Sequence, residues 1–318
     1  MSNKPLLYKY INLLLRLLIG VAAILLIGYK LKDDFFVHLR SDLFYNVHYQ
    51  YILLAFFLLF INWGLEAYKW KYLMRGVQEI PFFKAFQLTI AGITLGIITP
   101  NRIGEIPGRV LLLNHKNTFK TALIKTAIGA YAQLIVTFIF GVLALFFIAD
   151  GSGFQINHKY INILLLLLLG LFLLSYFYHQ LIQSIFYWIP YVKSKKWLAA
   201  LGDFSFKQRI YILLVSVLRY FVFSFQYFLI FKAFSIGFNS FSELLLIPMC
   251  FMLTSVIPTI LISEIGVRGS VALIVFGVIT DNGLALLVAS VLLWIINVAT
   301  PALMGLLYIN QLKIVKEG

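Results

Sequence analysis

The sequence predicts an all-α, polytopic membrane protein built from two inverted repeats. Hydrophobic residues make up 62% of its 318 residues and charged residues only 12%, about half the charged share of soluble domains. Long stretches lack Asp, Glu, Lys and Arg, and a short charged motif occurs twice, half the chain length apart. So few charges cannot coat a soluble enzyme of this size, and a single cysteine excludes a disulfide scaffold.

Six charge-poor stretches are long enough to cross a membrane as helices, because about 20 apolar residues span the hydrocarbon core. They are residues 10–29, 49–73, 126–149, 160–178, 210–231 and 282–310. The first follows Lys4 and Lys9 as a signal peptide would, but it lacks a clear small-residue cleavage site, and we expect it to be retained. Runs this continuous favour helices over the alternating strands of a β-barrel.

Two further pairs of apolar stretches are shorter, and each pair brackets a polar loop. They are residues 85–99 with 110–114, and residues 244–262 with 270–280. We expect each pair to form a re-entrant helical hairpin, at about 84–116 and about 243–281. Gly92 and Gly96 in the first pair have the spacing of a helix-packing face.

The two loops share a motif that indicates an internal duplication. Residues 103–109 read Ile-Gly-Glu-Ile-Pro-Gly-Arg, and residues 262–268 read Ile-Ser-Glu-Ile-Gly-Val-Arg. The motifs are 159 residues apart, which divides the chain into repeats at 1–159 and 160–318 within one membrane domain. Each repeat contains three spans and a hairpin. Because three crossings are odd in number, the second repeat is expected to be inverted relative to the first.

The basic residues are distributed unevenly over the two sides that this arrangement creates. With the N-terminus in the cytoplasm, 19 of the 26 Lys and Arg residues lie on the cytoplasmic side or in the hairpin that opens to it. This bias follows the positive-inside rule and explains the net charge of +14 without a nucleic-acid partner. We therefore expect both termini in the cytoplasm and a location in the plasma membrane, the inner membrane of a bacterium.

The charges of the two motifs are the candidate substrate-binding residues: Arg102, Glu105, Arg109, Glu264 and Arg268. In each motif the acid and base are four residues apart, so a helix places them on one face. One interpretation is a pair of surface turns with ordinary salt bridges. The other is a polar site within the membrane, where charges persist only when they face a cavity or each other.

Glu66 and Arg219 are a second pair of charges within predicted spans. They are expected to form either an interhelical ion pair or a part of a translocation path. Proline and glycine residues break both loops, and Ser263 is a candidate N-cap for the helix that carries Glu264. The sequence shows no metal-ligand spacing and no nucleophile or nucleotide-binding motif, so no catalytic residue, metal or cofactor is expected.

Residues 99–109, with Pro100-x-x-x-Gly104-Glu105, and residues 262–269 resemble the membrane region of the lysylphosphatidylglycerol synthase family. The resemblance implies a flippase-like domain. In bifunctional members this domain moves an aminoacylated phospholipid between leaflets, and a separate soluble domain makes that lipid. The sequence shows no such soluble domain, so we expect a stand-alone member that does not synthesise lipid. Ser263 stands where the second motif would lead one to look for glycine.

The leading functional prediction is a flippase-like transporter of a phosphate-containing lipid, of the phospholipid, aminoacyl-phospholipid or polyprenyl-phosphate type. One alternative is an intramembrane lipid-modifying enzyme or its membrane subunit, with Glu105 or Glu264 as acid/base groups. The other is an anchoring or assembly partner of another membrane enzyme. The expected partners are membrane lipids with anionic or zwitterionic headgroups, and a lipid-synthesis enzyme is a further candidate.

Overall fold

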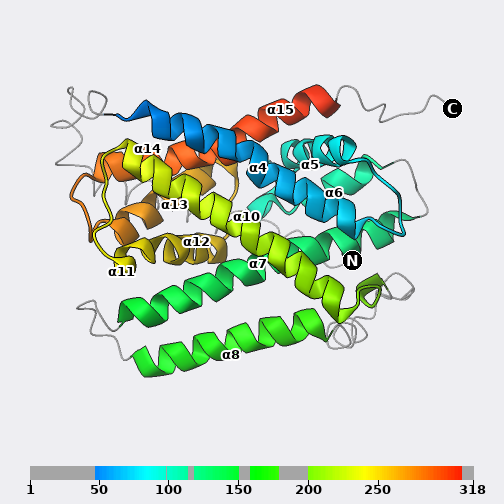
Figure 1. Cartoon of the computed structure of the whole chain (residues 1–318), viewed down its shortest axis with the longest axis horizontal. Helices are drawn as coiled ribbons and strands as arrows, with labels where there is room; N and C mark the ends of the chain where they lie inside the picture. Colours follow the sequence, from blue (N-terminus) through cyan, green and yellow to red (C-terminus); the bar gives the residue numbers. More distant parts are fainter. Residues whose placement is uncertain (1–46, 98, 114–117, 150–157, 179–199, 310–318) are drawn as a thin grey trace, which may run out of the picture.

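The computed structural model describes residues 47–97, 99–113, 118–149, 158–178 and 200–309, and these residues form helices without strands (Figure 1). Four of the described helices are long and apolar enough to cross a membrane. They are Tyr49–Leu73, Phe119–Phe147, Phe206–Ala233 and Gly283–Tyr308. The chain is therefore a multi-pass membrane protein, as predicted. The predicted first span, residues 10–29, and both termini lie outside the described residues.

In the first half of the chain, two long helices enclose a pair of short ones. The elements are α4 (Tyr49–Leu73), α5 (Phe82–Gly96), the 3₁₀ turn η1 (Pro100–Arg102), α6 (Glu105–Leu111) and α7 (Phe119–Ala149), and α8 (His158–Phe177) follows as the first described helix of the second half. Helix α4 has the predicted bounds, and α7 begins seven residues earlier than predicted. Helix α8, of 20 residues, coincides with the predicted span 160–178 to within two residues at each end.

The second half repeats this order of long, short, short and long helices. Its elements are α10 (Phe206–Ala233), the single turn α11 (Phe241–Leu244), α12 (Leu246–Val256), α13 (Leu261–Phe276), α14 (Gly283–Trp294), the π-helical turn η4 (Ile295–Ala299) and α15 (Thr300–Ile309). The predicted apolar run 244–262 is not one helix. Ile257 is extended, with a ψ of 120°, because the following Pro258 disfavours the helical conformation there.

Helices of each half pack against helices of the other half. Helix α4 lies along α10, α5 of the first half packs against α15 of the second, and α12 of the second half packs against α7 of the first. Within each half the short helices also contact each other, α5 with α6 and α12 with α13 (Figure 1). Both short pairs are therefore held in the interior by long helices from the opposite half.

Gly92 and Gly96 on α5 allow α6 to approach closely. A Cβ atom at Gly92 would collide with the side chain of Arg109, and one at Gly96 would collide with the side chain and backbone of Glu105. The interpretation of this glycine pair as a helix-packing face is confirmed. The glycines also decide where the two charged residues of α6 lie.

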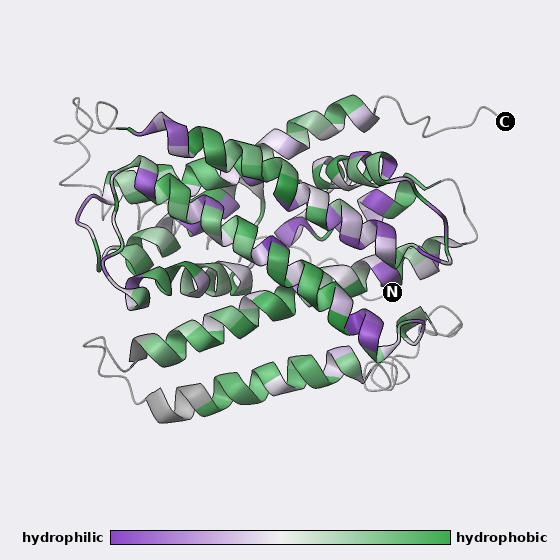
Figure 2. Cartoon of the chain, in the orientation of Figure 1, coloured by the Kyte–Doolittle hydropathy of each residue, from purple (hydrophilic) through white to green (hydrophobic). Residues whose placement is uncertain are grey.

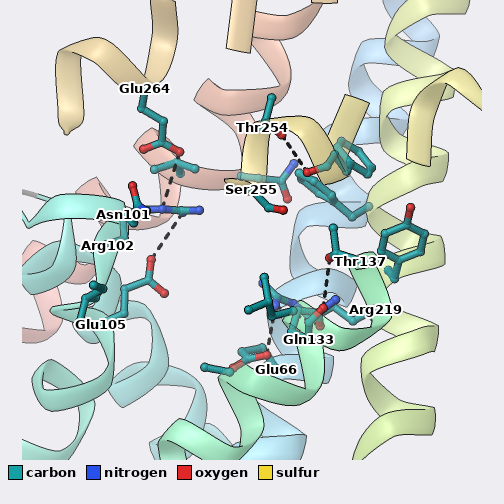
Figure 3. Close-up of a pocket in the computed structure, with 18 of the residues that line it drawn as sticks. Glu66, Asn101, Arg102, Glu105, Gln133, Thr137, Arg219, Thr254, Ser255 and Glu264 are labelled. Atoms are coloured by element: carbon teal, nitrogen blue, oxygen red, sulfur yellow. Dashed lines mark hydrogen bonds and ion pairs between the residues drawn. The ribbon is translucent and has the colours of Figure 1, made fainter. Parts of the chain in front are cut away.

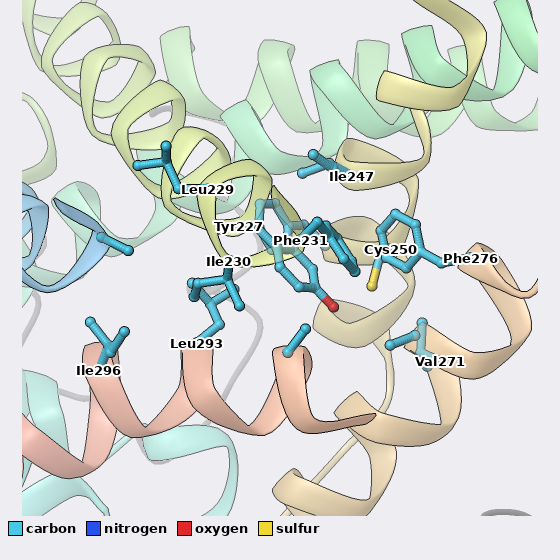
Figure 4. Packing of buried hydrophobic residues seen from close by; sticks show 14 of the residues in the cluster. Tyr227, Leu229, Ile230, Phe231, Ile247, Cys250, Val271, Phe276, Leu293 and Ile296 are labelled. Carbon is cyan, nitrogen blue, oxygen red and sulfur yellow. The ribbon is translucent and has the colours of Figure 1, made fainter. Parts of the chain in front are cut away.

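Aromatic and aliphatic side chains fill the interior between the helices. Tyr227 and Phe231 of α10 stack at 4.4 Å between ring centroids, and Phe276 of α13 lies 4.6 Å from Phe231 (Figure 4). Cys250 of α12 is buried in the same cluster. Large apolar side chains such as Phe57 and Leu167 are exposed on the outer faces of the helices, where hydrophobic residues predominate (Figure 2). Such a surface suits a lipid environment.

Candidate functional site

The turn between α5 and α6 meets the segment between α12 and α13. The Asn101 backbone N–H donates to the carbonyl oxygen of Thr259 at 2.8 Å, and the Thr259 N–H donates to Asn101 Oδ1 at 2.5 Å. Asn101 and Arg102 have φ values of 46° and 55°, in the left-handed region. Asparagine tolerates this conformation better than most residues, and after this turn Arg102 reaches Glu264 on α13.

Helix α6 begins earlier than the sequence predicts. The loop was expected to continue to Arg109, followed by an apolar stretch at 110–114, but the helix starts at Glu105. Pro107 does not prevent this, because it is the third helical residue and the first four N–H groups of a helix have no intrahelical acceptor. As predicted from their spacing, Glu105 and Arg109 share one face, with 3.5 Å between Oε2 and Nη2.

Ser263 is not the N-cap that the sequence predicted. The N-cap of α13 is Ile260, and Ser263 is the third helical residue. The Ser263 hydroxyl accepts from the Ile260 N–H at 2.8 Å and donates to the Ile260 carbonyl at 2.8 Å. The serine still stabilises the helix start, by the reciprocal half of a capping box.

Arg102 links the carboxylates of the two motifs. Its Nη1 lies 3.5 Å from Glu105 Oε1, and its Nε lies 3.7 Å from Glu264 Oε1. Glu264 also accepts from Arg268 Nη2 at 2.9 Å within α13. Figure 3 shows Arg102 between the two carboxylates. The motifs, 159 residues apart in sequence, therefore form one ionic group.

A second ionic group surrounds Glu66 on α4. Its Oε1 accepts from Arg109 Nη1 at 2.7 Å, and its Oε2 lies 2.8 Å from Lys69 Nζ and 3.2 Å from Arg219 Nη1. Glu66 and Arg219 thus form the predicted ion pair, and both also face the cavity described below. Arg109 contacts Glu66 and Glu105 and so joins the two groups. Only 5% of Arg109 and 6% of Glu264 is exposed, which is too little for surface turns.

Uncharged polar groups extend the second ionic group. Asn62 Oδ1 accepts from Arg219 Nε at 3.0 Å, and Asn62 Nδ2 donates to Asn297 Oδ1 at 2.7 Å. The guanidinium of Arg219 also lies 4.7 Å from the ring centroid of Trp63, within cation–π distance. Gln133 of α7 accepts from Arg219 Nη1 at 3.4 Å. These contacts hold Arg219 in one orientation although it lies within a membrane span.

A cavity of about 620 Å³ lies between these groups. All seven charged residues singled out from the sequence line it: Glu66, Arg102, Glu105, Arg109, Arg219, Glu264 and Arg268. In Figure 3, Glu66, Gln133 and Arg219 lie on the other side of the pocket from Arg102, Glu105 and Glu264. The remaining polar lining is uncharged and includes Thr137, Thr254, Ser255 and Thr259. The structure therefore brings both predicted sets of charges to one site.

Sequence reasoning missed four residues that complete the site: Asn62, Lys69, Gln133 and Asn297. A signal for two of them exists on α4, where Asn62, Glu66 and Lys69 follow one another at intervals of four and three residues. That spacing places all three on one face of a helix. Gln133 and Asn297 occur singly in apolar stretches, so their part in the site becomes visible only when the helices are packed.

Residues 13–305 match a protein family described as the lysylphosphatidylglycerol synthase TM region. The chain belongs to this family. The resemblance at the two motifs is confirmed, and it extends over nearly the whole chain. Membership in the lysylphosphatidylglycerol synthase TM family identifies the chain as a membrane domain of the synthase or flippase-like type. Comparison with curated proteins and with solved structures finds no match.

Proposed function

We propose that this member of the lysylphosphatidylglycerol synthase TM family is a flippase-like transporter that moves a phosphate-containing lipid between membrane leaflets. The observation that carries the proposal is the cavity of about 620 Å³ lined by four arginines and three glutamates. Its volume is within the range of ligand pockets, roughly 300–1,000 Å³. A phosphorylated headgroup fits such a space while its acyl chains remain in the bilayer.

The charges explain how a headgroup would cross hydrocarbon. A bare phosphate in the membrane interior is strongly disfavoured, and guanidinium groups replace its hydration with charge-assisted hydrogen bonds. Glu66, Glu105 and Glu264 offset the arginines when the cavity is empty and weaken their hold on the phosphate. Both effects favour passage over permanent binding.

The proposed architecture is a pair of inverted repeats, at 1–159 and 160–318, each with three spans and a re-entrant hairpin. Three observations support it: the repeated order of helices, the exchange of packing partners between the halves, and the meeting of the hairpin tips at Asn101 and Thr259. Transporters of this kind bind substrate at the repeat interface near the membrane centre. We place both termini in the cytoplasm and the protein in the bacterial inner membrane, following its charge distribution. Membrane lipids are then its partners.

The test is lipid movement in liposomes that contain the purified protein. Fluorescent phospholipid should move between leaflets faster than in protein-free vesicles, and Arg109→Gln should abolish the gain. Arg75→Gln, a change of an exposed arginine outside the cavity, is the matched control and should retain full activity. Mass spectrometry of the recovered lipid separates this proposal from the enzyme alternative, because a flippase leaves its lipid chemically unchanged. Lack of any protein-dependent movement would contradict the proposal.

A further inference from the structure

We infer that Arg102 is the arginine that binds the phosphate of the headgroup, and that the phosphate takes this guanidinium from Glu105 and Glu264. Because this assigns one residue of the cavity to one part of the substrate, it rests on the proposed function and deepens it. Four arginines line the cavity, and they differ in their hydrogen bonds, in their pairing with glutamates and in their backbone geometry.

Three of the four arginines are held by hydrogen bonds. Arg109 donates to Glu66 at 2.7 Å, and Arg268 donates twice to Glu264, at 3.1 and 2.9 Å. Arg219 donates to a side-chain amide at 3.0 Å and lies 3.2 Å from Glu66. Each of these guanidinium groups must weaken an existing bond before it can turn to a phosphate.

The guanidinium of Arg102 makes no hydrogen bond to any described residue. Its Nη1 lies 3.5 Å from Glu105 Oε1 and its Nε lies 3.7 Å from Glu264 Oε1, which is longer than the usual range for hydrogen bonds. Its side chain is 25% exposed, against 6% for Arg109, and it lies in the cavity between the two carboxylates (Figure 3). A guanidinium presents five N–H donors in a planar fork that matches a phosphate. In Arg102 this fork is free to bind one.

Arg102 is also the surplus cation of the cavity. Without it, Glu105 keeps Arg109 at 3.5 Å and Glu264 keeps Arg268 at 2.9 Å. The third glutamate of the cavity keeps all three of its cations, because Arg102 is not one of them. A buried charge is unfavourable when it lacks a full counterion, so an entering anion is stabilised most at Arg102.

The backbone at Arg102 indicates that its side chain is needed there. Its φ is 55°, and that of the preceding Asn101 is 46°. A left-handed conformation is unfavourable for an arginine, and such conformations are common at ligand-binding sites. Glycine would satisfy this turn more easily if the residue served only to join α5 to α6.

The phosphate competes with two carboxylates for Arg102. Bidentate, charge-assisted hydrogen bonds from a guanidinium to a phosphate are shorter and stronger than the present contacts. When Arg102 turns to the phosphate, the ionic link between Glu105 and Glu264 is removed. Glu105 Oε1, which is buried and has no hydrogen-bond partner among the described residues, can then accept from a hydroxyl or ammonium group of the same headgroup.

The experiment measures binding of dihexanoyl phosphatidylglycerol to the purified full chain in detergent, from the rise that the lipid causes in the thermal unfolding midpoint. Arg102→Gln should weaken the apparent affinity at least about tenfold, because it removes charge-assisted hydrogen bonds. Arg268→Gln, in the same cavity, should weaken it less than about threefold. Arg75→Gln, outside the cavity, should not change it.

Two further ligands identify the group that is bound. Dihexanoylglycerol, which lacks the phosphate, should not raise the midpoint of the wild type. Glycerol 3-phosphate, which lacks the acyl chains, should raise it much less than the lipid does at the same concentration. An equal rise with glycerol 3-phosphate would overturn the assignment of Arg102 to a lipid.

The unfolding midpoint without ligand separates a binding role from a structural one. Arg102→Gln should unfold near the wild-type midpoint, since its contacts are long and each carboxylate keeps another arginine. A large loss of stability in both Arg102→Gln and Arg102→Lys would make Arg102 structural and overturn the inference. Wild-type affinity in Arg102→Gln, or no lipid binding by the wild type, would also overturn it. Lipid binding through Arg102 without lipid movement in liposomes would instead contradict transport.

Discussion

Asn101 and Thr259 are joined by two reciprocal hydrogen bonds, each through a backbone N–H, where the turn before α6 meets the segment before α13. The contact depends on the left-handed backbone of Asn101, whose φ is 46°. Asn101→Ala removes the side-chain acceptor and disfavours this backbone, so it should destabilise the fold by about 1–2 kcal/mol. Asn101→Gly loses only the acceptor and should lie between alanine and the wild type. Thermal unfolding in detergent measures the stability order of the wild type, Asn101→Gly and Asn101→Ala. Equal unfolding midpoints for the three proteins would contradict a stabilising contact.

Gly96 should be intolerant of any side chain. Gly96→Ala forces the Glu105 end of α6 away from α5, and overpacking of this kind is unfavourable by about 1–3 kcal/mol. Because Glu105 then moves relative to the cavity, lipid movement should fall even where the protein still folds. Gly170→Ala on α8 is the control: nothing lies within 4 Å of its Cβ position, and its stability should be unchanged or higher. Equal unfolding midpoints for the two variants would exclude the close contact.

Glu66 balances three cations in the interior. Glu66→Gln leaves Lys69, Arg109 and Arg219 without their shared counterion, which should reduce stability by about 3–5 kcal/mol. Addition of Lys69→Met should recover part of that loss, because one of the three charges is removed. Glu79→Gln, at an exposed position, should have no effect. A double variant no more stable than Glu66→Gln would show that charge balance is not the cause.

Glu105 and Glu264 should act as a unit because Arg102 contacts both. In a double-mutant cycle of Glu105→Gln and Glu264→Gln, we expect a coupling of about 0.5–3 kcal/mol, measured from unfolding midpoints and from lipid-movement rates. Glu105→Gln with Glu243→Gln is the control, since Glu243 lies on α11 and does not line the cavity. That pair should be additive within about 0.5 kcal/mol.

The inverted arrangement predicts opposite sides for two loops. With Cys250 replaced by alanine, single cysteines at Ser152 and Ser194 should react with an impermeant maleimide from outside and inside the cell, respectively. Both positions lie outside the described residues. Reaction of both from the same side would exclude the inverted repeats.

The sequence predicted the long described helices and the charged residues that line the cavity. Lipid-facing helices must be apolar over about 20 residues, so the ends of a stretch such as 49–73 can be predicted from where its apolar residues end. Charges as rare as Glu66 and Arg219 stand out against that background. The motif repeat then indicated that Glu105 and Glu264 belong together, and the structure places Arg102 between them.

Other features depend on packing and local backbone geometry, which composition does not report. The start of α6 at Glu105 was missed because Pro107 suggested a break, although proline is compatible with a first helical turn. Ser263 was predicted as the N-cap because serine is common at that position. The N-cap is instead Ile260, three residues earlier, and its N–H donates to the Ser263 hydroxyl. Lys69 was counted among the 19 basic residues of the cytoplasmic side, but it is 1% exposed and donates to Ser216 of α10, a contact that only the packed helices reveal.

The π-helical turn at Ile295–Ala299 divides the last long helix into two parts that pack against different halves of the protein. On one side of it, α14 packs with α13 of its own half; on the other, α15 packs with α5 of the first half. A π turn interrupts the regular hydrogen-bond ladder and is a place where a helix bends readily. Relative movement of the halves would therefore concentrate its strain at one hinge, beside the amide of Asn297 that meets Asn62. We therefore expect the angle between α14 and α15 to change when a lipid headgroup enters the cavity.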